Sequence, residues 1–351
     1  MTHNASSLGT VRSIRVLSID GGGIRGIIPA RILSALEEAS GRPTAELFDI
    51  IVGTSIGGIA AMALALPGED GKPAPAEDIG AFYERHGKII FPQSGLSFPR
   101  SREDLRELIA RVGMQAAMFG SNPDVGNARY SAAPLEQALE KQFGDARLSD
   151  AIRDVIVTSY DVNRGGPKLF RSREARSEPS EDHLMRDVAR ATSAAPTVFP
   201  PFRLVSPDGS DHILIDGGVF ANNPSMIGYA EAMELAGWRG IRVRTIRLVS
   251  LGTGIPKAGM TTYEEFTGHS WLRLAEDMFE AANRGQSCLH DELLQNLLGD
   301  HYHRFEPTLP TEIAMDDASE ASMVALRHVT DDYVEHHKAE LDKLATVLAE
   351  G

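Results

Sequence analysis

The sequence predicts an α/β fold in which a mostly parallel central sheet is flanked by helices. Two apolar runs, Ile14–Ile19 and Phe48–Val52, have the composition of buried strands, and each leads into a short glycine-containing turn. A helical segment follows each turn, at Ile27–Ala39 and at Ile56–Leu66. Repeats of strand, tight turn and helix are typical of a parallel sheet covered by helices. The chain is 351 residues long and 42% hydrophobic, which is enough for a sizeable core.

The alternation loosens after the second helix and resumes further along the chain. A loop rich in proline and glycine, Pro67–Pro75, precedes a predicted helix at Ala76–Lys88. Further strands are expected at Asp154–Tyr160, Pro167–Phe170, His212–Ile215 and Arg244–Leu251. Further helices are expected at Met185–Ser193, Asn223–Ala236, Trp271–Leu298 and Ala318–Glu350. The pattern therefore predicts a helical C-terminal extension of the α/β fold.

Three segments that carry candidate chemistry extend from Asp20 to Gly218, so a domain boundary inside that range would divide them. We therefore expect a flexible N-terminal tail over residues 1–12 and one α/β catalytic domain over residues 13–255. Residues 256–351 are expected to form a mainly helical extension packed on the same domain.

Charge and composition exclude several classes of protein. The net charge of −14, from 35 basic and 49 acidic residues, opposes binding to a nucleic acid polymer and general adhesion to anionic lipid. A single cysteine, Cys288, excludes an internal disulfide and a cysteine-rich metal site, and suits a reducing cytoplasm. No apolar run approaches the roughly 18 residues that span a bilayer, and the polar N-terminus resembles no secretory signal. We expect a cytoplasmic protein.

The first candidate segment is Asp20–Gly26, in which Gly21, Gly23 and Gly26 match the dinucleotide fingerprint G-x-G-x-x-G. That fingerprint also needs an acidic residue at the end of the next strand, where this chain has Val52 followed by Gly53. A P-loop is excluded because no Gly-Lys-Ser/Thr follows. Apart from a purely structural turn, the glycines favour a site where an anion approaches backbone N–H groups.

The second segment, Gly53-Thr54-Ser55-Ile56-Gly57, has the G-x-S-x-G pattern between a strand and a helix. The flanking glycines, Gly53 and Gly57, leave room for a sharp bend that presents Ser55 as a nucleophile. The alternative is a serine that caps the helix, which does not require glycine on both sides.

The third segment is Asp216-Gly217-Gly218, which by itself is most often a simple turn. Asp216 ends an apolar strand, where side chains of an α/β sheet meet the ligand crevice. His212 lies on the same side of that strand, but four residues at about 3.3 Å each place it about 13 Å away. We therefore expect Asp216 to serve Ser55 directly, as a Ser–Asp dyad without histidine. No metal-ligand cluster is evident, and this chemistry needs no metal or cofactor.

These motifs resemble those of the patatin-like phospholipase family. The shared segments are DGGGIRG at Asp20–Gly26, GTSIG at Gly53–Gly57, ATSAAPTVFPPF at Ala191–Phe202, DGG at Asp216–Gly218 and SLGTG at Ser250–Gly254. The resemblance covers residues 13–255 and implies hydrolysis of lipid acyl esters on an α/β fold.

Under this resemblance Ser55 is the nucleophile, Asp216 is the proton acceptor, and an acyl-serine forms as the intermediate. The oxyanion hole is expected from the backbone N–H groups of Gly21, Gly22, Gly23, Ile24 and Arg25. The Arg25 side chain is expected either to carry part of the oxyanion or phosphate charge or to form an ordinary surface salt bridge.

The resemblance also extends, more weakly, to bacterial antiphage effector phospholipases that cyclic nucleotides activate. It implies a membrane phospholipid substrate, transient contact with the inner membrane face and a cyclic dinucleotide activator. The oligomeric state is open, with a homo-oligomer among the expectations. Two irregular stretches, Phe91–Arg100 and Met114–Asn127, are interpreted either as a lid or as loops that pack on the core.

Two alternative functions remain open at the level of the sequence. One is a soluble carboxylesterase or thioesterase that uses the same dyad, since the dyad does not define the acyl donor. The other is a lipid- or nucleotide-binding protein with a vestigial site.

Overall fold

The computed structural model of this chain describes residues 13–68, 71–92, 128–238, 245–256 and 271–350, with backbone alone for Trp238 and residues 271–277. Within these residues an eight-stranded sheet has the strand order β5-β6-β3-β2-β1-β7-β9, and β4 also pairs with β3. Its strands are β1 (Ser13–Ile19), β2 (Ile50–Thr54), β3 (Asp154–Asp161), β4 (Gly166–Arg171), β5 (Phe202–Val205), β6 (Asp211–Asp216), β7 (Thr245–Leu251) and β9 (Tyr302–Phe305).

The sheet is mixed but mostly parallel at its centre. The neighbours β3, β2, β1, β7 and β9 run parallel, whereas β4 and β6 pair antiparallel with β3 and β5 pairs antiparallel with β6. The predicted α/β fold with a mostly parallel sheet is therefore confirmed. Two further short strands, β8 (Ile255–Pro256) and β10 (Thr308–Leu309), form a separate parallel pair.

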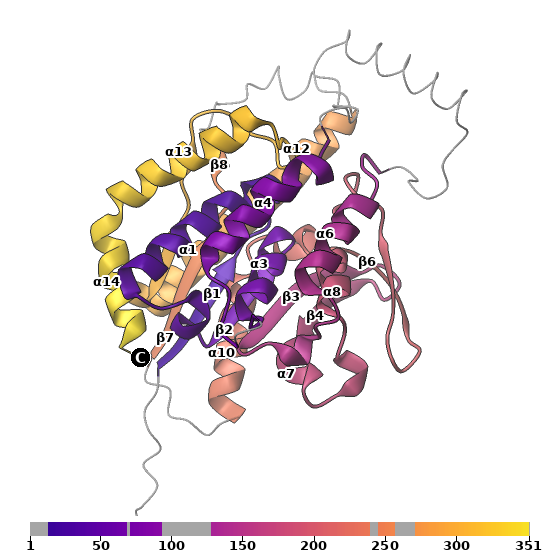
Figure 1. The fold of residues 1–351 in the computed structure, drawn as a ribbon, viewed down its shortest axis with the longest axis horizontal. Helices are drawn as coiled ribbons and strands as arrows, with labels where there is room; N and C mark the ends of the chain where they lie inside the picture. Colours follow the sequence, from indigo (N-terminus) through magenta and orange to yellow (C-terminus); the bar gives the residue numbers. More distant parts are fainter. Residues whose placement is uncertain (1–12, 69–70, 93–127, 239–244, 257–270, 351) are drawn as a thin grey trace, which may run out of the picture.

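Helices cover both faces of the sheet, as Figure 1 shows. They are α1 (Ile27–Ser40), α2 (Thr44–Leu47), α3 (Ile56–Ala65), α4 (Ala76–Ile90), α6 (Ala133–Phe143), α7 (Ser172–Ala175), α8 (Met185–Thr192), α9 (Gly218–Ala221), α10 (Ser225–Trp238), α12 (Trp271–Leu298), α13 (Glu320–His336) and α14 (Lys338–Ala349). Alternating residues of β1 face opposite cores. Leu17 packs in the core that includes α1 and α3, and Val16 in the core that includes α10 and α12.

The C-terminal third differs from its prediction in two ways. The single helix predicted at Ala318–Glu350 is wrong, because the chain breaks at His337 and forms α13 and α14, which both pack against α1 (Figure 1). The strand β9 was not predicted, although it adds to the central sheet by pairing with β7. The C-terminal helices themselves are present as expected.

No helix in the described ranges combines the length and the apolar character that crossing a bilayer would require. The two stretches interpreted as a lid or as packed loops lie outside the described residues, except for Phe91 and Pro92. Phe91 follows α4, and its ring contacts Tyr130 and Phe199 at centroid distances of 5.6 and 5.8 Å. For this residue the structure supports the packing role.

The helix α10 packs so closely on the sheet at Gly228 that a larger residue there should lower the stability of the protein. A Cβ atom at Gly228 would lie 2.8 Å from a methyl group of Val16 and 2.8 Å from one of Val52. Because valine is stiff at χ1, Gly228→Ala should lower the free energy of unfolding by about 1–3 kcal/mol. The matched control is Gly237→Ala in the same helix, where a Cβ atom would meet no atom of the described residues within 4 Å. Urea denaturation should show a lower midpoint for Gly228→Ala alone; equal midpoints would contradict the close packing.

Candidate active site

The register of β3 brings the ends of β2 and β6 together. Thr54, the last residue of β2, pairs with Thr158 of β3, and Asp216, the last residue of β6, pairs with the next residue, Ser159. Since β4 pairs with the opposite edge of β3, β2 and β6 share one edge and meet there end to end. This arrangement places Ser55, which follows Thr54, beside Asp216.

Ser55 occupies a sharp turn between β2 and α3. Its backbone has φ 55° and ψ −124°, which is unusual for a residue with a side chain. The flanking glycines make this turn sterically feasible. A Cβ atom at Gly53 would lie 2.1 Å from the carbonyl oxygen of Gly57, and one at Gly57 would lie 2.3 Å from that of Ile19. The turn therefore has the strained geometry of a nucleophile elbow.

The carboxylate of Asp216 is buried and accepts a hydrogen bond from the Gly218 N–H, at 2.7 Å to Oδ1. Burial raises the pKa of Asp216 to about 6, although the interactions with the Ser55 hydroxyl and the Gly218 N–H oppose that rise. Such an acid is a better match for a proton acceptor at neutral pH than an exposed aspartate.

The segment at Ala191–Phe202 supports both members of this pair, a role that motif matching did not assign to individual residues. Thr192 accepts a hydrogen bond from the Ser55 N–H at 2.8 Å through Oγ1. The Ala194 carbonyl accepts one from the Asp216 N–H at 3.0 Å. Both contacts hold the backbone N–H groups of Ser55 and Asp216, so they fix the positions of the two residues.

The glycine-rich segment lies beside Ser55, but not all of the expected N–H donors are free. The N–H of Gly21 donates to the Asn222 carbonyl at 3.0 Å, that of Ile24 to Met315 at 2.8 Å, and that of Arg25 to Gly22 at 3.2 Å. Of the five expected donors, the N–H groups of Gly22 and Gly23 are those without an acceptor in the described part of the chain. The expected set is therefore reduced to two, because long-range contacts engage the N–H groups of Gly21 and Ile24 and a local turn engages that of Arg25.

Several of the motif glycines also pack closely against other segments of the chain. A Cβ atom at Gly21 would lie 3.3 Å from the Cβ of Ser55, and one at Gly22 would lie 2.2 Å from Oγ1 of Thr253. At Gly26 it would press on the Tyr83 ring, and at Gly217 on Thr158. Gly218 contributes its N–H to Asp216, as described above.

The Arg25 side chain is not an ordinary surface group. Its Nε is buried and has no hydrogen-bond partner in the described part of the chain. Burial lowers the pKa of its guanidinium, and the nearby charges of Glu280, Glu306 and Glu312 oppose that shift.

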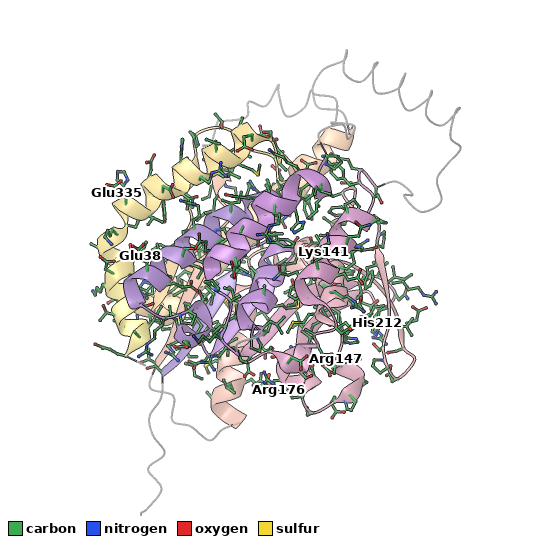
Figure 2. All side chains as sticks on the ribbon, viewed as in Figure 1. Glu38, Lys141, Arg147, Arg176, His212 and Glu335 are labelled. Atoms are coloured by element: carbon green, nitrogen blue, oxygen red, sulfur yellow. The ribbon has the colours of Figure 1, made fainter. Side chains whose placement is uncertain are left out.

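Among the described residues, no histidine donates to or accepts from the Ser55 or Asp216 side chain. His212 is buried at the β5–β6 side of the molecule (Figure 2), where Nδ1 contacts the Asp161 carboxylate at 2.7 Å. The guanidinium of Arg164 also contacts the His212 ring, at 2.9 Å. Nor does this part of the chain contain a group of three or more histidine, cysteine or acidic residues arranged to hold a metal ion.

A buried ion cluster that sequence analysis missed connects the C-terminal third to the glycine-rich segment. Arg304 of β9 donates to Asp20 at 2.7 Å, to Ser250 at 2.7 Å and to Glu306 at 2.8 Å. Asp291 of α12 lies 3.6 Å from the same guanidinium. Burial raises the pKa of Asp20 to about 7, and Arg304 opposes that shift. Since Asp20 directly precedes Gly21, this cluster fixes the start of the glycine-rich segment.

The cluster predicts a large loss of stability when its cation is removed. Arg304→Met should lower the free energy of unfolding by about 3–5 kcal/mol, because it leaves buried carboxylates without their partner. The control is Arg203→Met, which removes the exposed Arg203–Asp211 pair and should leave the unfolding midpoint near that of the wild type. Thermal and urea unfolding measure the stability of both variants. A similar small effect for the two variants would show that the buried cluster does not hold the fold.

Comparisons with known proteins identify the family of this chain. The sequence model of the family "Patatin-like phospholipase" matches residues 17–228. Patatin-like protein 1 of Oryza sativa subsp. indica is 33% identical, over 87% of this chain and 77% of its own length. Patatin-17 of Solanum cardiophyllum is 30% identical, over 96% and 90%. The solved structure of VipD from Legionella pneumophila is 15% identical with a TM-score of 0.41, covering 92% of this chain and 67% of that one. From the matching family segment and the two plant relatives, this chain belongs to the patatin-like phospholipase family.

Proposed function

We propose that this enzyme hydrolyses fatty-acyl esters of membrane phospholipids, with Ser55 as nucleophile and Asp216 as proton acceptor. The observation that carries the proposal is the placement of Ser55, on a strained turn, beside the buried Asp216 carboxylate, whose pKa the Ser55 hydroxyl lowers. The hydroxyl and its base are arranged for direct proton transfer.

In the first half of the reaction, Ser55 Oγ attacks the ester carbonyl carbon while its proton passes to Asp216. The tetrahedral intermediate collapses by cleavage of the carbon–oxygen ester bond, and the leaving alcohol takes the proton from Asp216. An acyl-Ser55 and a lysophospholipid result. In the second half, water transfers a proton to Asp216 and attacks the acyl carbon, which releases the fatty acid and restores Ser55.

The oxyanion is assigned to the N–H groups of Gly22 and Gly23. Both N–H groups lack an acceptor among the described residues, and the segment adjoins Ser55 through Gly21. Asp20, which precedes these glycines in the chain, is held by Arg304. The N–H of Ile24, which follows them, donates to the Met315 carbonyl. These two contacts hold the two donors in place. Donors that need no rearrangement during the reaction stabilise a developing negative charge most effectively.

A small apolar cavity lies next to these groups. Its volume is about 10 Å³, and it lies between the glycine-rich segment, the start of α3 and α4. The lining residues are Gly23, Ile24, Ile56, Phe82, Tyr83, Gly87, Ile90 and Phe91. The cavity holds about one water-sized group, so a longer acyl chain needs movement of these side chains or a path outside them.

Substitution of the two proposed catalytic residues tests the function. Ser55→Ala should reduce hydrolysis to background, and Asp216→Asn should lower kcat/KM by about 10²–10⁴-fold, the usual contribution of a general base. The measurement is fatty-acid release from phosphatidylcholine vesicles, alongside hydrolysis of a soluble short-chain ester. Ser34→Ala, which removes a hydroxyl bonded within α1, and Asp208→Asn, at an exposed carboxylate, are matched controls.

The two assays separate the proposed function from its alternatives. Hydrolysis of the soluble ester without release from vesicles would favour a soluble esterase, and no labelling of Ser55 by a fluorophosphonate would favour a vestigial site. Wild-type activity of Ser55→Ala or Asp216→Asn would contradict the dyad. Activation by a cyclic nucleotide in antiphage defence has no support in the described residues. A panel of cyclic dinucleotides added to the vesicle assay tests it separately.

The raised pKa of Asp216 gives the activity a defined pH dependence. Protonated Asp216 cannot accept the Ser55 proton, so kcat/KM should fall as pH decreases through the pKa of about 6 and reach a plateau above it. The check is a pH profile with an uncharged ester, with circular dichroism at each pH to show that the protein stays folded. A profile unchanged between about pH 7 and pH 5 would contradict a base with this pKa.

A further inference from the structure

The helix α12 exposes a continuous apolar stripe. Along it the side chains of Met278, Leu289, Leu293 and Leu297 are 61%, 54%, 40% and 54% exposed. Ala282 and Gly285 continue the same line at intervals of three or four residues, and both are exposed. From Met278 to Leu297 the stripe is about 28 Å long at about 1.5 Å per residue. Five of the eleven exposed large apolar side chains in the described ranges lie on this one helix, which marks it as a surface for a partner.

A different face of α12 is attached to the segment that follows Asp216. Gln286 donates to the Phe220 carbonyl at 2.6 Å, and His290 Nδ1 contacts the Asn223 carbonyl at 3.0 Å. The Asn223 side chain also donates to Ser287 at 3.0 Å. Phe220 lies four residues after the proposed base, so whatever binds the stripe is held next to the catalytic segment.

We infer that the stripe docks the enzyme on an uncharged phospholipid surface; this inference rests on the proposed function, in which the substrate is a membrane lipid. The charges on the helix support a neutral surface over an anionic one. Between Met278 and Leu298 there are three acidic residues and one basic residue, and the whole chain has a net charge of −14. Attraction to anionic headgroups is therefore absent, and binding depends on insertion of the apolar side chains.

The spacing of the stripe argues against a coiled-coil pairing along the whole of α12 with a second copy. The intervals from Met278 to Leu289 alternate between four and three, but Leu289, Leu293 and Leu297 then follow at successive intervals of four, whereas a coiled coil alternates throughout. This second part of the stripe drifts around the helix and leaves a coiled-coil seam. Ala281 and Cys288 flank the stripe on one side, together with the exposed carboxylate of Glu292.

The sole cysteine of the chain provides a direct probe. Cys288 is exposed on α12 and adjoins Leu289, so an environment-sensitive fluorophore can be attached there without substitution. Titration with phosphatidylcholine vesicles should shift the emission to shorter wavelength, and brominated lipid should quench it. No change with phosphatidylcholine, or binding confined to anionic vesicles, would overturn the inference.

Matched triple variants test the stripe itself. Leu289→Glu/Leu293→Glu/Leu297→Glu should weaken vesicle binding and lower vesicle hydrolysis by about ten-fold or more, because three inserted apolar groups are replaced by charges. The soluble short-chain ester should be hydrolysed as by the wild type. The control variant, Val162→Glu/Val205→Glu/Ile213→Glu, changes apolar side chains that are 49%, 57% and 38% exposed elsewhere. It should bind vesicles normally.

The outcomes separate this inference from the proposed function. If the wild type hydrolyses neither substrate, the proposed function fails, while the Cys288 signal still reports docking. Equal loss of vesicle binding in both triple variants would overturn the stripe as the docking surface. So would sedimentation that shows a wild-type dimer dissociated by the α12 variant, since the stripe would then bind a second copy.

Discussion

The antiparallel pairing of β6 with β3 is the constraint on which the site depends. It places the last residue of β6 one position beyond the last residue of β2 along the same edge of β3. Ser55 and Asp216 are 161 positions apart in the chain, yet their separation in space is set by one hydrogen-bonded register. A slip of one residue would turn the Asp216 side chain to the other face of the sheet. The residues packed on both faces of the sheet hold β6 in this register. They therefore keep Ser55 and Asp216 together as well as stabilising the fold.

The strain at Ser55 is supported by contacts that leave no room for side chains. A non-glycine residue in this conformation costs about 1–3 kcal/mol, and the surrounding structure must supply that energy. Here the close backbone approach of Gly53 to Gly57, and of Gly57 to Ile19, packs the turn tightly. The hydrogen bond from the Ser55 N–H to Thr192 completes the support. The strained turn places the Ser55 hydroxyl at the start of α3, next to the Asp216 carboxylate.

The sequence predicted those parts of the site that depend on local patterns. Apolar runs followed by glycine turns located β1, β2 and the end of β6, and with them Ser55 and Asp216. The free oxyanion donors could not be located, since the contacts of Gly21 with Asn222 and of Ile24 with Met315 join distant segments. β9 was missed because a four-residue strand carries little pattern, and Arg304 was missed with it. What escaped prediction was set by contacts between distant segments or lay in elements too short to carry a pattern.

The ion pair between Asp20 and Arg304 has a consequence for how far the enzyme can be shortened. The segment that defines the family, residues 17–228, includes Asp20 but ends 76 positions before Arg304 (304 minus 228). It also ends before β7, the strand that hydrogen-bonds along β1. A fragment with those boundaries would contain the DGGGIRG, GTSIG and DGG segments. It would nevertheless bury the Asp20 carboxylate without its cation, directly in front of the glycine-rich segment. The smallest unit that can fold around this site is therefore larger than the segment by which it is recognised.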